Sequence, residues 1–145
     1  MDHLAIMRKS WGLLPKILNK EKTIESRWYK NKRAPWDRIK KGDFVYFKDS
    51  GRPVTVKAEV LDVLQFSGLN SQKIKDILGK YAKQDGIQKK EIDKYYQMFK
   101  DKNYCLLVFL RSPEKIKSFK VDKKGFGMMS AWITVDDINR LKAQR

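Results

Sequence analysis

The sequence contains a single cysteine, Cys105, and a single histidine, His3, among its 145 residues. One cysteine excludes an internal disulfide, and one histidine with one cysteine cannot assemble the usual zinc sites. His3 stands beside a terminus that we expect to be mobile, which argues against a catalytic histidine. We therefore predict no bound metal and no cofactor, and any chemistry must use Lys, Arg, Asp, Glu, Ser, Thr or Tyr side chains.

Long apolar runs are also missing from the chain. The longest nearly uninterrupted one, 104–110, is far shorter than the ~20 residues that a membrane-spanning helix needs. The first six residues lack the basic region, apolar run and cleavage site of a secretory signal. We therefore predict a cytoplasmic protein without a membrane partner. Its length and its 41% of hydrophobic residues predict one domain spanning 1–145.

The spacing of apolar residues predicts an α+β fold. A helix within 10–19 becomes regular near Leu13, because Pro15 is tolerated only in the first turn. Two helices follow over 70–84 and 89–102, and a short one ends the chain; their apolar stripes indicate packing against a sheet. Without regular βαβ alternation, the sheet is expected to be mixed and partly closed. The predicted strands are 4–7, 23–29, 44–47, 54–60, 104–110, 118–121 and 130–135.

Acidic residues are few, with 17 Asp and Glu against 33 Lys and Arg, and the formal net charge is +16. This excess indicates a polyanionic partner; a simple gain in solubility is the alternative. Segment 28–41 interleaves basic and aromatic side chains, a composition typical of single-strand binding. Trp28 is assigned to the core, whereas Tyr29 and Trp36 are expected to stack on bases, unless Trp36 plugs the end of the barrel. The candidate contacts are Tyr29, Lys30, Lys32, Arg33, Trp36 and Arg38, with Lys123 and Lys124 beside the glycine loop 125–127.

Strand alternation over 23–29 places Glu25 and Arg27 on one face. A carboxylate and a guanidinium on one face can present acceptors and a fork of donors to a base edge or a phosphate. Lys22, just before the strand, can fold into the same pocket. The alternative is a plain salt-bridged pair on a solvated face.

Residues 20–27, Lys-Glu-Lys-Thr-Ile-Glu-Ser-Arg, resemble the ASCH-family signature Gly-x-Lys-x-x-Glu-x-Arg, with Lys20 in the place of the glycine. Lys41-Gly42-Asp43, Ser50-Gly51, Gly125-Phe126-Gly127 and Ala131-Trp132-Ile133 follow in the order typical of these proteins. The resemblance implies a PUA-like, partly closed β-barrel with flanking helices. It also implies a cleft beside the motif strand, a role for Lys22, Glu25 and Arg27 in that cleft, and RNA binding or RNA-linked chemistry.

Some ASCH relatives are amidohydrolases that act on acetylated cytidine, and this resemblance implies a lysine, a threonine and a glutamate as the triad. Lys22 matches the lysine, but Glu25 stands in the threonine position, Thr23 is one residue away, and Asp85 is a candidate for the acid. A ribonuclease using Lys22 and Glu25 as its catalytic pair is a second enzymatic alternative. We expect Lys22→Ala to leave stability nearly unchanged.

Our leading hypothesis is a protein that holds RNA, single-stranded or structured, or a nucleotide in a basic cleft. A small hydrolase acting on a modified nucleoside or on RNA is the alternative, and an acidic protein partner is a third. Whether the chain is an enzyme stays open at this point.

Overall fold

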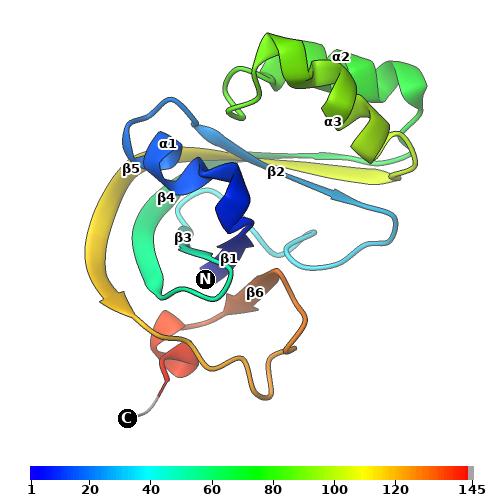
Figure 1. Cartoon of the computed structure of the whole chain (residues 1–145). Coiled ribbons are helices and arrows are strands. Elements are labelled where there is room, and N and C mark those ends of the chain that lie inside the picture. Colours follow the sequence, from blue (N-terminus) through cyan, green and yellow to red (C-terminus); the bar gives the residue numbers. More distant parts are fainter. Residues whose placement is uncertain (144–145) are drawn as a thin grey trace.

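The computed structural model describes residues 1–143, and its main feature is a six-stranded sheet with the order β2-β5-β4-β3-β1-β6. β1 and β3 are parallel and all other neighbours are antiparallel, so the sheet is mixed, as predicted. Figure 1 shows β4 and β5 curling around β1 and β3, which makes a partly closed barrel. The strands are β1 (Asp2–Met7), β2 (Ile24–Tyr29), β3 (Phe44–Asp49), β4 (Val54–Phe66), β5 (Tyr104–Phe119) and β6 (Trp132–Val135).

Three α-helices flank the sheet, which confirms the α+β class: α1 (Leu13–Leu18), α2 (Ser71–Tyr81) and α3 (Ile92–Phe99). Short 3-10 helices occupy Lys9–Trp11, Lys89–Glu91 and Ile138–Leu141. In Figure 1, α2 and α3 lie together over β2 and β5, on the side opposite to the curl. Within residues 1–143, no helix is long and apolar enough to cross a membrane.

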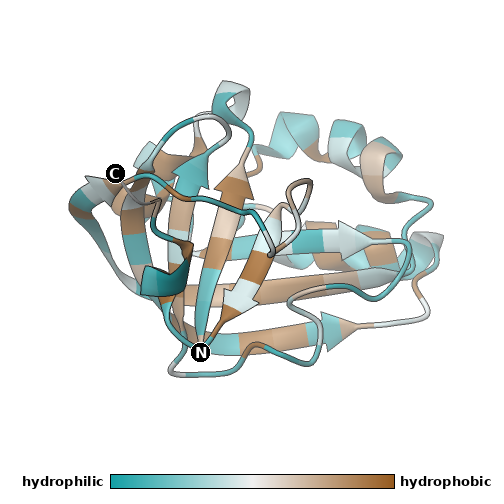
Figure 2. Ribbon diagram, turned by 90° about the horizontal axis from the view of Figure 1, so that it is seen from below, coloured by the Kyte–Doolittle hydropathy of each residue, from teal (hydrophilic) through white to brown (hydrophobic). Residues whose placement is uncertain are grey.

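Both faces of the central strands are buried. On β5, Leu106 and Val108 point into the curl around Phe47, whereas Cys105 and Leu107 point toward α2 and α3. This explains why 104–110 is a continuous apolar run instead of an alternating one. Figure 2 shows the hydrophobic segments concentrated on the strands. A third apolar cluster joins β1 and β6 to the C-terminal 3-10 helix.

Two sequence-based expectations are wrong. Residues 118–121 do not form a separate strand, because β5 continues to Phe119; in the second half of β5 only Pro113, Ile116 and Phe119 are half-buried, and the other residues are exposed. The terminus at His3 is not mobile, since β1 pairs with both β3 and β6. His3 is fully buried: its Nε2 lies 2.9 Å from Asp43 Oδ2, and its Nδ1 accepts from Trp132 Nε1 at 3.1 Å.

Candidate functional site

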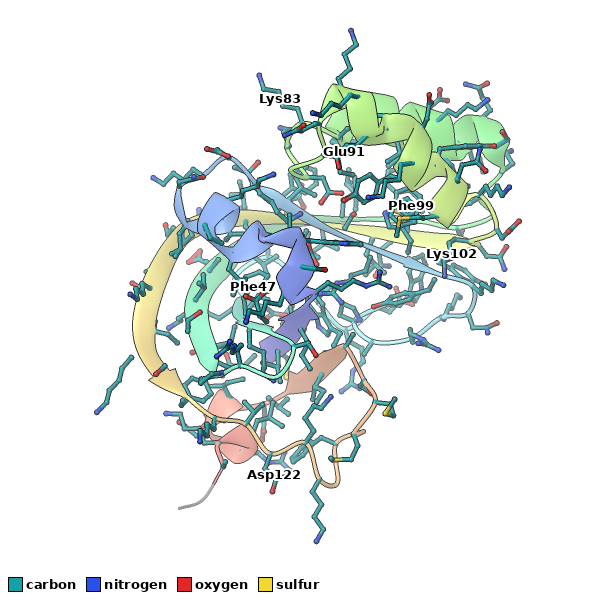
Figure 3. All side chains as sticks on the ribbon, viewed as in Figure 1. Phe47, Lys83, Glu91, Phe99, Lys102 and Asp122 are labelled. Carbon is teal, nitrogen blue, oxygen red and sulfur yellow. The ribbon has the colours of Figure 1, made fainter. Side chains whose placement is uncertain are left out.

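A pocket of about 510 Å³ opens beside β2, between the 3-10 helix at 9–11, the turn at 85–87 and α3. Five of the candidate site residues named from the sequence line it: Lys22, Glu25, Arg27, Tyr29 and Asp85. In Figure 3, Phe99 and Lys102, which also line the pocket, lie at the end of α3 nearest to β2. The pocket therefore draws on segments far apart in the sequence.

Lys22 anchors the floor of this pocket and is only 2% exposed. Its Nζ donates to Asp85 Oδ1 at 2.5 Å and to the carbonyls of Ile24 and Asp85 at 2.7 Å, and lies 3.1 Å from Glu25 Oε1. The other Asp85 oxygen accepts from Ser26 Oγ at 2.5 Å. Gly86 packs against the Lys22 stem and adopts φ +80°, a backbone conformation that favours glycine.

The carboxylates around Lys22 keep it charged. Burial alone lowers the pKa of Lys22, but Asp85 and Glu25 outweigh burial and raise that pKa above its ordinary value. Burial raises the pKa of Asp85, and the Lys22 ammonium acts in the opposite direction. Removing Lys22 leaves two buried carboxylates without this cation, a change that costs about 3–5 kcal/mol in comparable buried pairs. The expectation that Lys22→Ala spares stability is therefore wrong.

Arg27 continues the charged floor toward the other end of the sheet. Its Nε donates to Glu25 Oε2 at 2.9 Å, so Glu25 is shared between Arg27 and Lys22. Its two Nη atoms donate to the carbonyls of Ala131 and Ile6 at 3.4 and 3.3 Å, and the guanidinium lies 5.1 Å from the Trp132 ring centroid. Arg27 thus joins β2 to β1 and to the start of β6.

Aromatic side chains form the walls of the pocket. Trp28 stacks on Phe99 with ring centroids 4.4 Å apart and planes 6° apart, and Trp11 meets the edge of Tyr95 at 5.8 Å. The Arg8 guanidinium lies 4.9 Å above the Trp11 ring. Sequence reasoning missed Trp11, Tyr95 and Phe99 as pocket residues, because their helical spacing is also that of ordinary core packing.

The remaining candidates lie outside the pocket lining. Lys30, Lys32, Arg33 and Arg38 are exposed on the 30–41 loop that follows β2. Tyr29, which does line the pocket, donates its hydroxyl to Ala34 O at 3.0 Å under Arg33. Half-buried Trp36 is outside the lining and meets the edge of Tyr104. The stacking roles of Tyr29 and Trp36 stay predictions.

The two lysines of the glycine loop also lie outside the lining. Lys123 Nζ donates to Ser130 O at 3.1 Å, and Lys124 N donates to Asp122 Oδ1 at 2.9 Å. Within residues 1–143, no group of His, Cys, Asp and Glu side chains is arranged to hold a metal ion.

No family model and no curated protein match this sequence. Solved structures do: ASCH from Zymomonas mobilis aligns with a TM-score of 0.66 and 13% identity over 99% of this chain and 96% of that one. A mutant of the Zymomonas protein aligns with a TM-score of 0.61 and 14% identity over 85% and 79% of the two chains. The N-terminal domain of Staphylothermus marinus McrB aligns with a TM-score of 0.53 and 11% identity over 96% and 90%. The chain therefore has the fold of an ASCH domain, as the resemblance of residues 20–27 predicts.

Proposed function

We propose that this chain is a single-domain protein that binds single-stranded RNA and holds one nucleotide in the pocket beside β2. The observation that carries this proposal is the combination of a charged floor with aromatic walls. A nucleobase has a polar edge and two flat apolar faces, and unstacked bases are bound by hydrogen bonds to the edge and by stacking on aromatic rings. Glu25 supplies acceptors, Arg27 supplies donors, and Trp11 and Tyr95 supply ring surface.

The exposed basic loop after β2 suits the phosphates of a bound strand. Lys30, Lys32, Arg33 and Arg38 follow directly on the strand that carries Glu25 and Arg27, and the whole chain carries a net charge of +16. Phosphate contacts of this kind supply most of the affinity for single strands and make it salt-dependent. The likeness to ASCH from Zymomonas mobilis supports the proposal at the level of fold.

Binding is favoured over hydrolysis at the same site. Lys22 has a raised pKa and already donates to three oxygens, so it is a poor proton acceptor near neutral pH. Glu25 is held between Lys22 and Arg27, which leaves neither of its oxygens without a cationic partner. The arrangement therefore lacks a free base, although it offers fixed donors and acceptors.

The test is fluorescence anisotropy of a short single-stranded RNA at salt concentrations of about 50 to 300 mM. The logarithm of the affinity should fall with the logarithm of salt by about 0.7 per neutralised phosphate. Replacing Lys32, Arg33 and Arg38 together with alanine should flatten this slope. A matched triple variant on α2 and the turn after it, with alanine at Lys75, Lys80 and Lys83, removes the same charge and should change the slope much less.

The pocket is tested with Trp11→Ala, which should weaken RNA binding by roughly tenfold if the ring stacks on a base. A salt-independent affinity, or an equal loss in both triple variants, contradicts the proposal. Turnover of acetylated cytidine or RNA by the wild-type protein at about pH 5 to 9 would instead favour the hydrolase.

A further inference from the structure

Lys48, near the end of β3, is a buried lysine that does not line the pocket. The residue is 9% exposed, and its Nζ donates no hydrogen bond to a described residue. This Nζ is not among the enclosed polar atoms that lack a partner, so the tip of the side chain reaches solvent while the stem is buried. Lys48 therefore presents an unpaired ammonium to solvent at the end of a buried stem.

Lys123, which precedes the glycine loop, lies near Lys48, because its Nζ donates to Ser130 O and the next residue, Ala131, accepts from the N–H of Ile6, the β1 residue paired with Lys48. Burial lowers the pKa of Lys48, and the nearby ammonium of Lys123 lowers it further. Lys123 Nζ donates to the neutral carbonyl of Ser130, 3.1 Å away. Across residues 1–143, no carboxylate forms a salt bridge with either ammonium. Two cations thus share one region of the protein without a paired negative charge.

The loop that carries Lys123 is held in a defined shape. Phe126 N donates to Lys123 O at 2.8 Å, and Ser130 N donates to Gly127 O at 3.1 Å. Gly127 adopts φ +98°, a conformation that favours glycine, and a Cβ on it would lie 2.6 Å from Ser130 Oγ. The Ser130 hydroxyl therefore lies close to the Gly127 backbone.

This pair of lysines adjoins the pocket through two backbone connections. Ile6, a pocket residue, lies opposite Lys48 in the β1–β3 pairing. Ala131, another pocket residue, directly follows Ser130, and its carbonyl accepts from both Ile6 N and Arg27 Nη1. Lys48 and Lys123 therefore adjoin the Ile6 and Ala131 side of the pocket.

We propose that Lys48 and Lys123 form a phosphate site that binds a backbone phosphate of the strand whose nucleotide lies in the pocket. Two ammonium groups suit a phosphate diester because each donates charge-assisted hydrogen bonds to a separate oxygen. The inference rests on the proposed function for the source of the phosphate. The two lysines could bind a phosphate whether or not it belongs to RNA, so inorganic phosphate and RNA serve as separate probes.

The experiment compares wild type with Lys48→Met, which keeps the apolar stem and removes the ammonium. Lys117→Met is the matched control, since Lys117 is exposed on β5 in the same basic region. Sodium phosphate should raise the melting temperature of wild type and of Lys117→Met above that in sodium chloride of equal ionic strength, but not that of Lys48→Met. Affinity for a short single-stranded RNA should fall about tenfold in Lys48→Met, as expected for a charge-assisted contact, and its salt slope should flatten by about 0.7.

The measurements with phosphate and with RNA distinguish a failure of the lysine site from a failure of the proposed function. If wild type binds no RNA but shows the Lys48-dependent effect of phosphate, the lysine pair is supported as a phosphate site and the proposed function is overturned. If Lys48→Met and Lys117→Met bind RNA equally, the site on the RNA path is overturned while the proposed function stands. A lack of any phosphate effect in wild type overturns the lysine pair itself. If Lys48→Met fails to fold, Lys123→Met gives the same readouts.

Discussion

Lys20 adopts a left-handed backbone conformation with φ 68°, a region that favours glycine. Its N–H donates to Ile17 O at 3.2 Å, closing the turn after α1. This is the position at which the ASCH signature has glycine. The turn that leads Lys22 into the pocket therefore keeps a glycine-type geometry, and the lysine side chain makes it more costly.

Lys20→Gly should stabilise the protein by about 0.5–1 kcal/mol. A non-glycine residue is destabilised by about 1–2 kcal/mol in this conformation. Replacing it with glycine removes this strain, but part of the gain is lost because the unfolded chain becomes more flexible. Denaturant unfolding measures the difference. Lys16→Gly, inside α1, is the matched control and should lose about 1 kcal/mol, because glycine is a poor helix former. Equal destabilisation by both changes would show that Lys20 is unstrained.

At the scale of residues, the alternation of side chains along the predicted strand 23–29 predicted part of the site but not all of it. It placed Glu25 and Arg27 on one face of a strand, and both line the pocket. Asp85 entered only through the resemblance to amidohydrolases, because a separation of 63 residues from Lys22 carries no periodic signal. Lys48 lay just outside the predicted strand 44–47 and carried no signal, since the burial of its stem is a property of the folded chain.

At the scale of elements, Arg27 holds the open barrel together. β2 and β6 are the two edges of the sheet, and Arg27 links β2 to the carbonyls of Ile6 and Ala131. A lysine in this position has one ammonium in place of a planar fork and cannot reach Glu25 and both carbonyls at once. The same side chain therefore serves the pocket and the fold.

Arg27→Lys should lower the free energy of unfolding by about 1–3 kcal/mol, the range for leaving buried hydrogen-bonding groups unsatisfied. Arg111→Lys is the control, because Arg111 pairs with Glu59 on the surface and is 48% exposed. Surface pairs contribute about 0–1 kcal/mol, so the control should lose little. Urea unfolding of both variants checks the prediction, and equal losses would refute the role of Arg27 in closing the barrel.

Some helices and strands could be predicted from the sequence and others could not. The sequence indicates the buried run at 104–110 by its continuous apolar residues, and it indicates α2 by apolar residues at helical spacing. It does not indicate the second half of β5, because charged residues such as Lys115 and Lys117 face solvent and break the apolar pattern. Its pairing with β4, which only the fold reveals, makes it a strand.

At the scale of the whole molecule, His3 makes stability depend on pH. Burial lowers the pKa of His3 below 6.5, and the hydrogen bond and charge of Asp43 offset this only in part. The unfolded chain therefore takes up a proton near pH 6.5 that the folded chain accepts only at lower pH. Stability is fully present above this range and falls as the pH drops through it, by at most about 1.4 kcal/mol per pH unit.

The measurement is the free energy of unfolding between about pH 7.5 and 5. Because His3 is the only histidine, His3→Gln should be less stable at neutral pH and should show a flatter dependence over this range. An unchanged slope would exclude His3 as the group responsible.

Overall architecture was more predictable than the relation between its surfaces. The order of strands and helices predicted an α+β fold with a mixed, partly closed sheet, and the fold has both features. Whether the basic loop after β2 and the glycine loop lie near the same pocket was beyond the sequence. The end of the glycine loop does lie near the pocket, because Ser130 N donates to Gly127 O and the next residue, Ala131, lines the pocket.

The open sheet also bears on self-association. Exposed edge strands recruit strands from other chains, and proteins avoid this with short edges and with charged side chains that point inward. β6 has only four residues, and the other edge, β2, carries Glu25 and Arg27 on the face toward the pocket. A one-residue slip of β2 would move both side chains to the other face of the sheet, away from Lys22 and from the Ile6 and Ala131 carbonyls. The residues proposed to read a base thereby also fix the register of this edge strand.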